Sequence, residues 1–152
     1  VDVFVGNFEM CHRLPLAERL AVEPLTLPLA ELLLTKLQIV KINGKDLGDL
    51  AALLLEHPVG NGDKETINAA RIAELCGKDW GLWKTIGINL HKLHSFASSQ
   101  DLPDEAKQAI KTRADELLKV LDDAPKSLKW KTRAAIGERV QWYELPEEVN
   151  RG

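Results

Sequence analysis

Residues 27–57 read LPLAELLLTKLQIVKINGKDLGDLAALLLEH, and this leucine-rich stretch decides the fold class. Its apolar positions recur at the three- and four-residue spacing of one helix face, which predicts an amphipathic helix. Pro28 suits the first turn of that helix, which we expect to run to about Val40. Asn43-Gly44-Lys45-Asp46 is typical of a helix cap, and it predicts a second helix that ends at about His57.

A lysine interrupts the apolar face of the first helix. That face consists of Leu29, Leu32, Leu33, Lys36, Leu37 and Val40. An unpaired buried ammonium is costly, so Lys36 needs an acidic partner or an anionic ligand. Three interpretations stay open. The lysine stem lies along the apolar face with its ammonium in water, the ammonium pairs with Asp46 or Asp49, or it contacts phosphate as a point charge.

The first residues of the chain have the pattern of a strand. In residues 1–5, valines alternate with Asp2 and Phe4, which is the period of a half-buried strand. Gly6-Asn7 is a turn signal, and residues 8–14 are expected to return as a second strand. Because a lone two-stranded hairpin is marginal in water, helices or further strands should cover it. Asp2 is then either an exposed edge residue or a metal-binding carboxylate.

The rest of the chain is predicted to be helical. Helices are expected at about 68–77, 79–97, 103–121 and 125 or 127 to 139, followed by an extended tail over 140–145. The expected fold class is therefore mainly α with a short N-terminal β-hairpin, built as a bundle of five or six helices. We expect residues 1–152 to form one unit, with the sheet part in 1–24 and the helical region in 25–152.

Composition excludes several classes of protein. The chain of 152 residues carries a net charge of −3, so it has no global basic field for nucleic acid. No apolar run approaches the roughly 20 residues that span a bilayer. Cys11 and Cys76 belong to no Cys-x-x-Cys pair, which favours a reducing cytoplasm. The chain starts without Met and inside a strand pattern, so we expect a piece of a longer protein.

Other side chains have both a structural and a functional interpretation. Asp46 and Asp49 share a helix face and could bind metal or act as acid and base; alternatively, Asp46 is a cap and Asp49 pairs with Lys45. His91 and His94 have the spacing of joint metal ligands, but the sequence offers no third ligand, which favours a structural role. The best small patch for nucleic acid is Trp130 with its basic neighbours, and this patch is too small by itself to indicate binding. The basic neighbours are Lys126, Lys129, Lys131 and Arg133.

Three segments together resemble a known superfamily. They are Val-Asp-Val-Phe at the start, Leu-Pro-Leu-Ala-Glu-Leu-Leu-Leu-Thr-Lys-Leu-Gln over 27–38, and Lys-Asp-Leu-x-Asp-Leu-x-x-Leu-Leu over 45–54. As a set they are similar to the nucleotidyltransferase superfamily, most closely its abortive-infection and toxin-type branch. The resemblance covers roughly the first 57 residues. The Gly-[Gly/Ser] turn and the Asp-x-Asp pair of that superfamily are absent from this chain.

The resemblance implies roles for five residues. Asp2 matches the third catalytic and metal-binding acid, and Lys36 matches a helix lysine near the triphosphate. Lys45, Asp46 and Asp49 match a segment that is either substrate-facing or structural. Residues 1–24 would then be the remnant of the nucleotidyltransferase sheet.

The intact parent would use Mg²⁺ and a nucleoside triphosphate to modify an unknown acceptor. One aspartate cannot hold two metal ions, so this chain alone is expected to be inactive.

A second hypothesis does not involve catalysis. The chain would be a non-enzymatic helical module for protein–protein interaction, such as one half of a toxin–antitoxin pair, with Lys36 merely structural. An unpaired edge of the N-terminal hairpin would favour self-association under either hypothesis.

Overall fold

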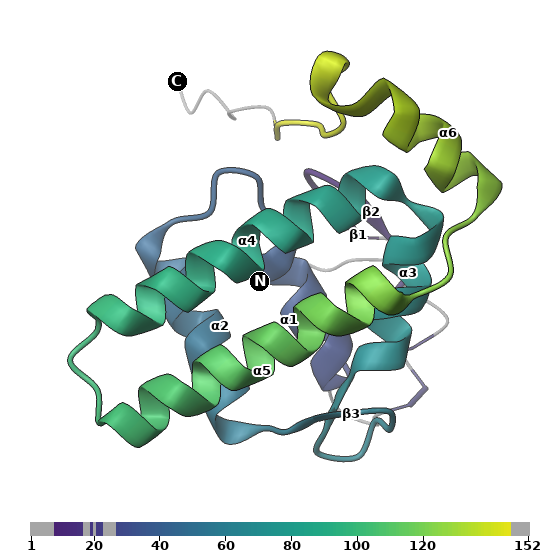
Figure 1. Cartoon of the computed structure of the whole chain (residues 1–152). Coiled ribbons are helices and arrows are strands. Elements are labelled where there is room, and N and C mark those ends of the chain that lie inside the picture. The colour runs from purple at the N-terminus through teal and green to yellow at the C-terminus, as the bar shows by residue number, and fades with distance from the viewer. Residues whose placement is uncertain (1–7, 17–18, 20, 23–26, 147–152) are drawn as a thin grey trace, which may run out of the picture.

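The computed structural model describes residues 8–16, 19, 21–22 and 27–146. Six α-helices dominate these residues, as Figure 1 shows. They are α1 (Leu29–Leu37), α2 (Gly44–Glu56), α3 (Ala69–Lys78), α4 (Trp80–Ser99), α5 (Asp104–Asp123) and α6 (Leu128–Ile136), with a short 3-10 turn, η2 (Gly137–Arg139), after the last. The predicted fold class, mainly α with a small β element near the N-terminus, is confirmed.

A hairpin forms within residues 8–14, which we expected to be a single strand. Residues 8–14 do not form one strand, because β1 (Phe8–Glu9) turns back and pairs antiparallel with β2 (Arg13–Leu14). The side chain of Gln38, just after α1, accepts hydrogen bonds from the backbone N–H groups of Cys11 and His12 at 3.0 and 3.1 Å. These two hydrogen bonds supply an acceptor for the backbone N–H groups of the turn, which explains why the chain reverses there. The strand expected over residues 1–5 lies outside the described residues.

A second pair of strands was not predicted. β3 (Val59–Gly60) and β4 (Ile67–Asn68) pair in parallel, and the N–H of Ile67 also donates to the carbonyl of Pro58 at 2.9 Å. Each strand has two residues, which is too short for an alternating pattern to show in the sequence.

The core lies between the long helices α4 and α5 and the shorter helices α1, α2 and α3. In Figure 1, α4 and α5 run side by side across the molecule and α1 and α2 lie behind them. Leucines at helical spacing fill the interior. Those without exposed surface include Leu33, Leu34, Leu37, Leu50, Leu54, Leu90 and Leu93. Burial of each leucine side chain contributes about 2 kcal/mol, so this core accounts for most of the stabilising energy.

Side-chain caps set where the helices begin. Asn43 and Asp46 form the capping box of α2, with Asp46 N–H donating to the Asn43 side chain at 2.9 Å. The carboxylate of Asp79 caps α4 by accepting from the N–H of Leu82 at 3.1 Å. Ser127 caps α6 in the same way through the N–H of Trp130. These caps agree with the starts that the sequence predicts to within a few residues.

Helix α6 is peripheral. It has no buried residue, and in Figure 1 it lies at one end of the molecule beyond α3 and the start of α4. Gly81 lets the C-terminal tail approach α4, because a Cβ atom there would lie 2.7 Å from the carbonyl oxygen of Trp142. No helix in the described residues has the length and apolar character needed to cross a membrane.

Candidate functional site

Lys36 joins two acids at the junction of α1 and α2. Its Nζ lies 3.0 Å from Oδ1 of Asp46 and 3.1 Å from Oδ2 of Asp49. The hydrogen bond with Asp46, together with that with Asp49, raises the pKa of Lys36 against a smaller opposing effect of burial. The lysine side chain keeps 34% of its surface exposed. Lys36 is therefore a charged, partly hydrated group, and the sequence-based ion pair with Asp46 or Asp49 is present with both.

The two acids are held to different degrees. Asp46 is 14% exposed, and its second oxygen accepts from the backbone N–H of Asn43 at 3.4 Å within the capping box. Asp49 is 49% exposed. The expected pair between Asp49 and Lys45 is wrong in the described structure, because Lys36 takes Asp49 and Lys45 is exposed. The reason is geometric: the end of α1 brings the Lys36 ammonium across to the face of α2 that carries both acids.

An open hollow adjoins this cluster. It has a volume of about 350 Å³ between α1 and α2, and Lys36 and Asp49 line it together with Thr35, Leu53 and Glu56. A small polar ligand could reach the lysine from this side. Its polar lining consists of three charged side chains, Lys36, Asp49 and Glu56, and the hydroxyl of Thr35.

The metal prediction is not supported by these acids. Lys36 already pairs with both Asp46 and Asp49 at hydrogen-bond distance, so a magnesium ion bound by both acids would have to displace the ammonium. In the described part of the chain, no three His, Cys, Asp or Glu side chains come together as a metal site. Asp2, the predicted catalytic and metal-binding acid, lies outside the described residues. The magnesium expected for the parent therefore stays a prediction.

Sequence reasoning missed a buried ionic cluster around Glu31. This glutamate has no exposed surface, and one of its oxygens, Oε1, accepts from Nε of Arg19 at 2.8 Å and from Nε of Arg71 at 3.1 Å. Arg19 also pairs with Asp63, which in turn accepts from Asn68 at 3.0 Å. Glu31 is not on the helix face that we predicted: the buried residues of α1 include Ala30 and Leu34, whereas Leu29 and Leu32 are only partly buried.

The Glu31 cluster joins distant segments. Arg19 comes from the segment before α1, Asp63 from the loop between β3 and β4, and Arg71 from α3. Arg71 also donates to the carbonyl of Pro15 at 3.2 Å. Because the central carboxylate is inaccessible to solvent, we assign the cluster to the stability of the fold.

A second buried polar network surrounds Thr85 on α4. Its hydroxyl lies 2.7 Å from Nε2 of His12 and accepts from the indole N–H of Trp142 at 3.1 Å. The hydroxyl either donates to Nε2 of His12 or accepts from it, depending on the tautomer of the imidazole. Burial lowers the pKa of His12, and the charge of Asp79 opposes this only in part. Burial thus favours the neutral form of His12, and the imidazole links the N-terminal hairpin turn to α4.

The cysteines and the paired histidines offer no catalytic centre in the described residues. Burial raises the pKa of the Cys76 thiol far above its usual range, so no thiolate is available there. Nε2 of His94 lies 3.6 Å from Asp115, whereas His91 is exposed on α4. The structural role of the two histidines stays a prediction.

All four tryptophans of the chain gather where α6 meets α4. Trp83 and Trp130 are in edge contact with ring centroids 5.2 Å apart, and Trp80 and Trp142 with centroids 5.9 Å apart. The guanidinium of Arg133 lies 4.8 Å from the centroid of the Trp80 ring. These contacts fix α6 and the tail to the body of the protein.

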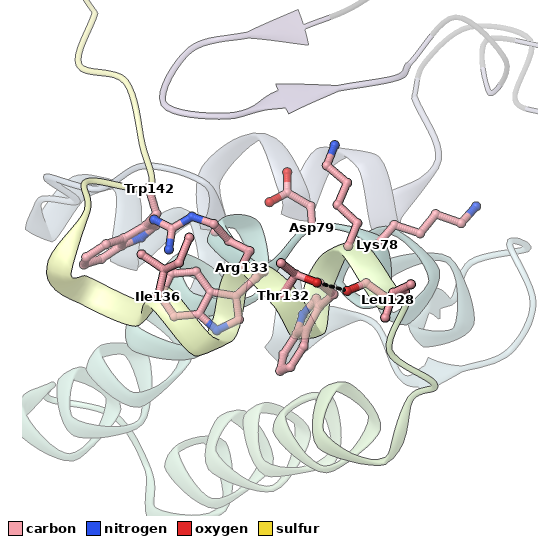
Figure 2. Close-up of a pocket in the computed structure, with 11 residues that line it drawn as sticks. Lys78, Asp79, Leu128, Thr132, Arg133, Ile136 and Trp142 are labelled. Atoms are coloured by element: carbon pink, nitrogen blue, oxygen red, sulfur yellow. Dashed lines mark hydrogen bonds between the residues drawn. The ribbon is translucent and has the colours of Figure 1, made fainter.

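A groove of about 650 Å³ opens between α6, the start of α4 and the tail. We call it the α6 groove. It is lined by Lys78, Asp79, Trp80, Gly81, Leu128, Lys129, Trp130, Thr132, Arg133, Ile136 and Trp142. Figure 2 shows Arg133, Ile136 and Trp142 together at one end and Leu128 at the other. Leu128 is 81% exposed although its side chain is a large apolar one.

Comparison with protein-family models, with curated protein sequences and with solved structures finds no match for this chain. The function is therefore argued from the residues themselves.

Proposed function

We propose that this chain is the C-terminal portion of a nucleotidyltransferase-like protein in which Lys36 contacts the triphosphate of a nucleotide. The observation that supports the proposal is the gathering of Lys36, Asp46 and Asp49 beside an open hollow. These are three of the residues on which the resemblance to the superfamily rests. The parent would transfer a nucleotidyl group to an acceptor whose chemistry the cluster does not specify.

The geometry of Lys36 suits a phosphate contact. A lysine ammonium has three donors, and here two of them face Asp46 and Asp49. The third can be offered to a ligand oxygen in the hollow. Nucleotidyl transfer depends mostly on positioning and charge neutralisation, so a lysine held in place by two acids would contribute without making a covalent bond.

The chain by itself is expected to be inactive. The described acids beside Lys36 are engaged with it, and the Asp-x-Asp pair of the superfamily is absent from the sequence. Incubation with a labelled nucleoside triphosphate and Mg²⁺ should therefore transfer no label. Robust metal-dependent labelling that Asp2→Ala abolishes would contradict this expectation.

Lys36→Met in the intact parent tests the role of the ammonium. This change keeps the stem and removes the charge, so triphosphate binding should weaken by about 1.5–3 kcal/mol, the range for a charged hydrogen bond. Lys41→Met is a matched control, because Lys41 is exposed just beyond α1. Calorimetric titration with the triphosphate measures both variants. Unaltered affinity of Lys36→Met for the triphosphate would rule out this lysine as a nucleotide ligand.

A helical module for protein–protein interaction is the second candidate function. The specific observation in its favour is the α6 groove, where large apolar side chains stay exposed next to basic ones. Under this candidate Lys36 is a structural ion-pair residue, and the partner occupies a different part of the molecule from the Lys36 cluster.

A further inference from the structure

We propose that the α6 groove binds an acidic segment of a partner protein that carries apolar side chains. This inference rests on the second candidate function and is independent of any role for Lys36 in nucleotide binding. Three observations support it: the exposed apolar side chains of the groove, its positive charge, and the covered faces of its aromatic rings.

Exposed apolar side chains concentrate at this end of the molecule. Six large hydrophobic side chains in the described residues are exposed, and four of them follow α5. These four are Leu128, Ile136, Val140 and Leu145, with exposed fractions of 81%, 40%, 55% and 44%. Helix α6 buries no residue, so its apolar side chains are not used by the core. A cluster of this kind is typical of a surface that a partner covers.

The charge of the same segment is opposite to that of the chain. Residues 126–139 hold five basic side chains and one acid, Glu138, whereas the whole chain has a net charge of −3. Glu138 is itself paired with Lys84 of α4 at 2.7 Å. At the groove, Lys78 pairs with Glu74 at 3.2 Å, and Asp79 is occupied as the cap of α4. Lys129 makes no ion pair with any residue that the structure describes.

The uncompensated charge of the α6 groove is therefore positive. Complementarity at interfaces places negative groups opposite such a patch, so we infer that the partner segment is acidic. The exposed side chains of Leu128 and Ile136 call for apolar side chains between its acids. An acidic segment with interspersed leucine or aromatic residues satisfies both requirements.

The aromatic rings favour a protein over a single-stranded nucleic acid. Base stacking needs free ring faces. Here Arg133 covers the Trp80 ring, which is itself only 6% exposed. Trp130 is engaged by Trp83 and by Lys126, whose Nζ lies 5.6 Å from its ring centroid. The side chains left open, Leu128 and Ile136, are aliphatic and do not stack on bases.

The test is a selection from a random library of displayed 12-residue peptides against the 152-residue chain. Enriched peptides should combine Asp or Glu with Leu, Phe or Trp. A fluorescein-labelled copy of the most enriched peptide then gives a dissociation constant by anisotropy. Binding should also weaken as salt is raised, because the rim charges are exposed and screened.

Two variants locate the binding site. Leu128→Ser removes the most exposed apolar side chain of the groove, and Lys129→Glu reverses the charge beside it. Each should weaken peptide binding by about fivefold or more, since rim charges and apolar anchors both contribute to association. The matched controls are Leu55→Ser and Lys92→Glu, which change exposed residues of α2 and α4 away from the groove. These controls should leave affinity unchanged.

Three outcomes would overturn the proposal. If no peptide is enriched, or if the groove variants bind the enriched peptide as tightly as the unsubstituted chain, the second candidate function fails with it. If enriched peptides lack acids yet depend on Leu128, the interaction module stands and the acidic partner is wrong. If a 12-nucleotide oligothymidylate binds more tightly than the peptide, with the same sensitivity to Lys129→Glu, the groove is a nucleic-acid site.

Discussion

Helix α1 carries two ionic clusters that differ in burial. At its start, Glu31 is completely inaccessible and is flanked by Arg19 and Arg71. Near its end, Lys36 is about one-third exposed and is flanked by Asp46 and Asp49. Each cluster places one charge of α1 between two opposite charges, yet only the Lys36 cluster lies next to an open hollow.

The difference in burial decides what each cluster can do. A charge that loses all its water depends entirely on its partners, so removal of one partner is costly. A charge that keeps part of its hydration can exchange a partner for water or for a ligand at little cost. We therefore expect the Glu31 cluster to maintain the fold and the Lys36 cluster to be available for binding.

The largest effect is expected for Arg71→Met. This change leaves the buried carboxylate of Glu31 with fewer compensating charges, so the free energy of unfolding should fall by about 3–5 kcal/mol. Urea denaturation followed by circular dichroism measures it. The double variant with Glu31→Met should lose less than the sum of the two single changes, because both charges are then gone. A loss below about 1 kcal/mol for Arg71→Met is the range of exposed ion pairs, and it would contradict the assignment of the Glu31 cluster to the stability of the fold.

A buried titratable group, His12, should make the free energy of unfolding depend on pH. The pKa of His12 is lowered from its ordinary value of 6.5, so below that value the unfolded chain binds more protons than the folded chain. The free energy of unfolding should therefore fall as the pH is lowered from about 7.5 to about 5.5, by at most about 1.4 kcal/mol per pH unit for this group. The lowered pKa values of Asp63 and Glu74 affect stability only at lower pH.

Denaturation at a series of pH values checks this expectation. His12→Gln should flatten the dependence, whereas His91→Gln on the exposed side of α4 should leave it unchanged. An equal slope in the unsubstituted chain and in His12→Gln would show that His12 is not responsible.

A smaller effect is expected for Lys36→Met. Asp46 keeps its hydrogen bond from the N–H of Asn43, and the half-exposed Asp49 regains water. The free energy of unfolding should change by about 1 kcal/mol or less, as for other partly exposed ion pairs. Thermal melts of Lys36→Met and Arg71→Met, measured side by side, compare the loss of stability in the two clusters directly. A loss of several kcal/mol would place Lys36 in the same class as the buried cluster.

The smallest effect on stability is expected in the α6 groove. Leu128→Ser changes a side chain that is 81% exposed, so the free energy of unfolding should stay within about 0.5 kcal/mol of the original. Lys129→Glu places an acid in the first turn of α6, where the helix dipole favours it. Chemical denaturation checks both. A clear destabilisation would mean that the groove belongs to the fold and is not spare surface.

Much of the helical architecture was predictable because it depends on local pattern. Leucine spacing around Leu33 and Leu50, the cap formed by Asn43 and Asp46, and Asp79 before α4 all act within a few residues. Pairing with Asp46 or Asp49 was one of the three interpretations of Lys36 that the sequence left open, and the structure has both pairs. The turn within residues 8–14 was not predicted because the acceptor that stabilises it, Gln38, lies 26 and 27 residues away.

The sequence by itself determined which segments are helical, where several of them begin, and that a charge within a leucine face must find a partner. Only the tertiary structure decided that Glu31 is the buried charge and Lys36 the accessible one, since both lie in the same leucine-rich segment. It also decided that four tryptophans distributed from residue 80 to residue 142 meet at α6. The physical reason is that periodicity is a local property, whereas burial depends on which distant elements cover each face.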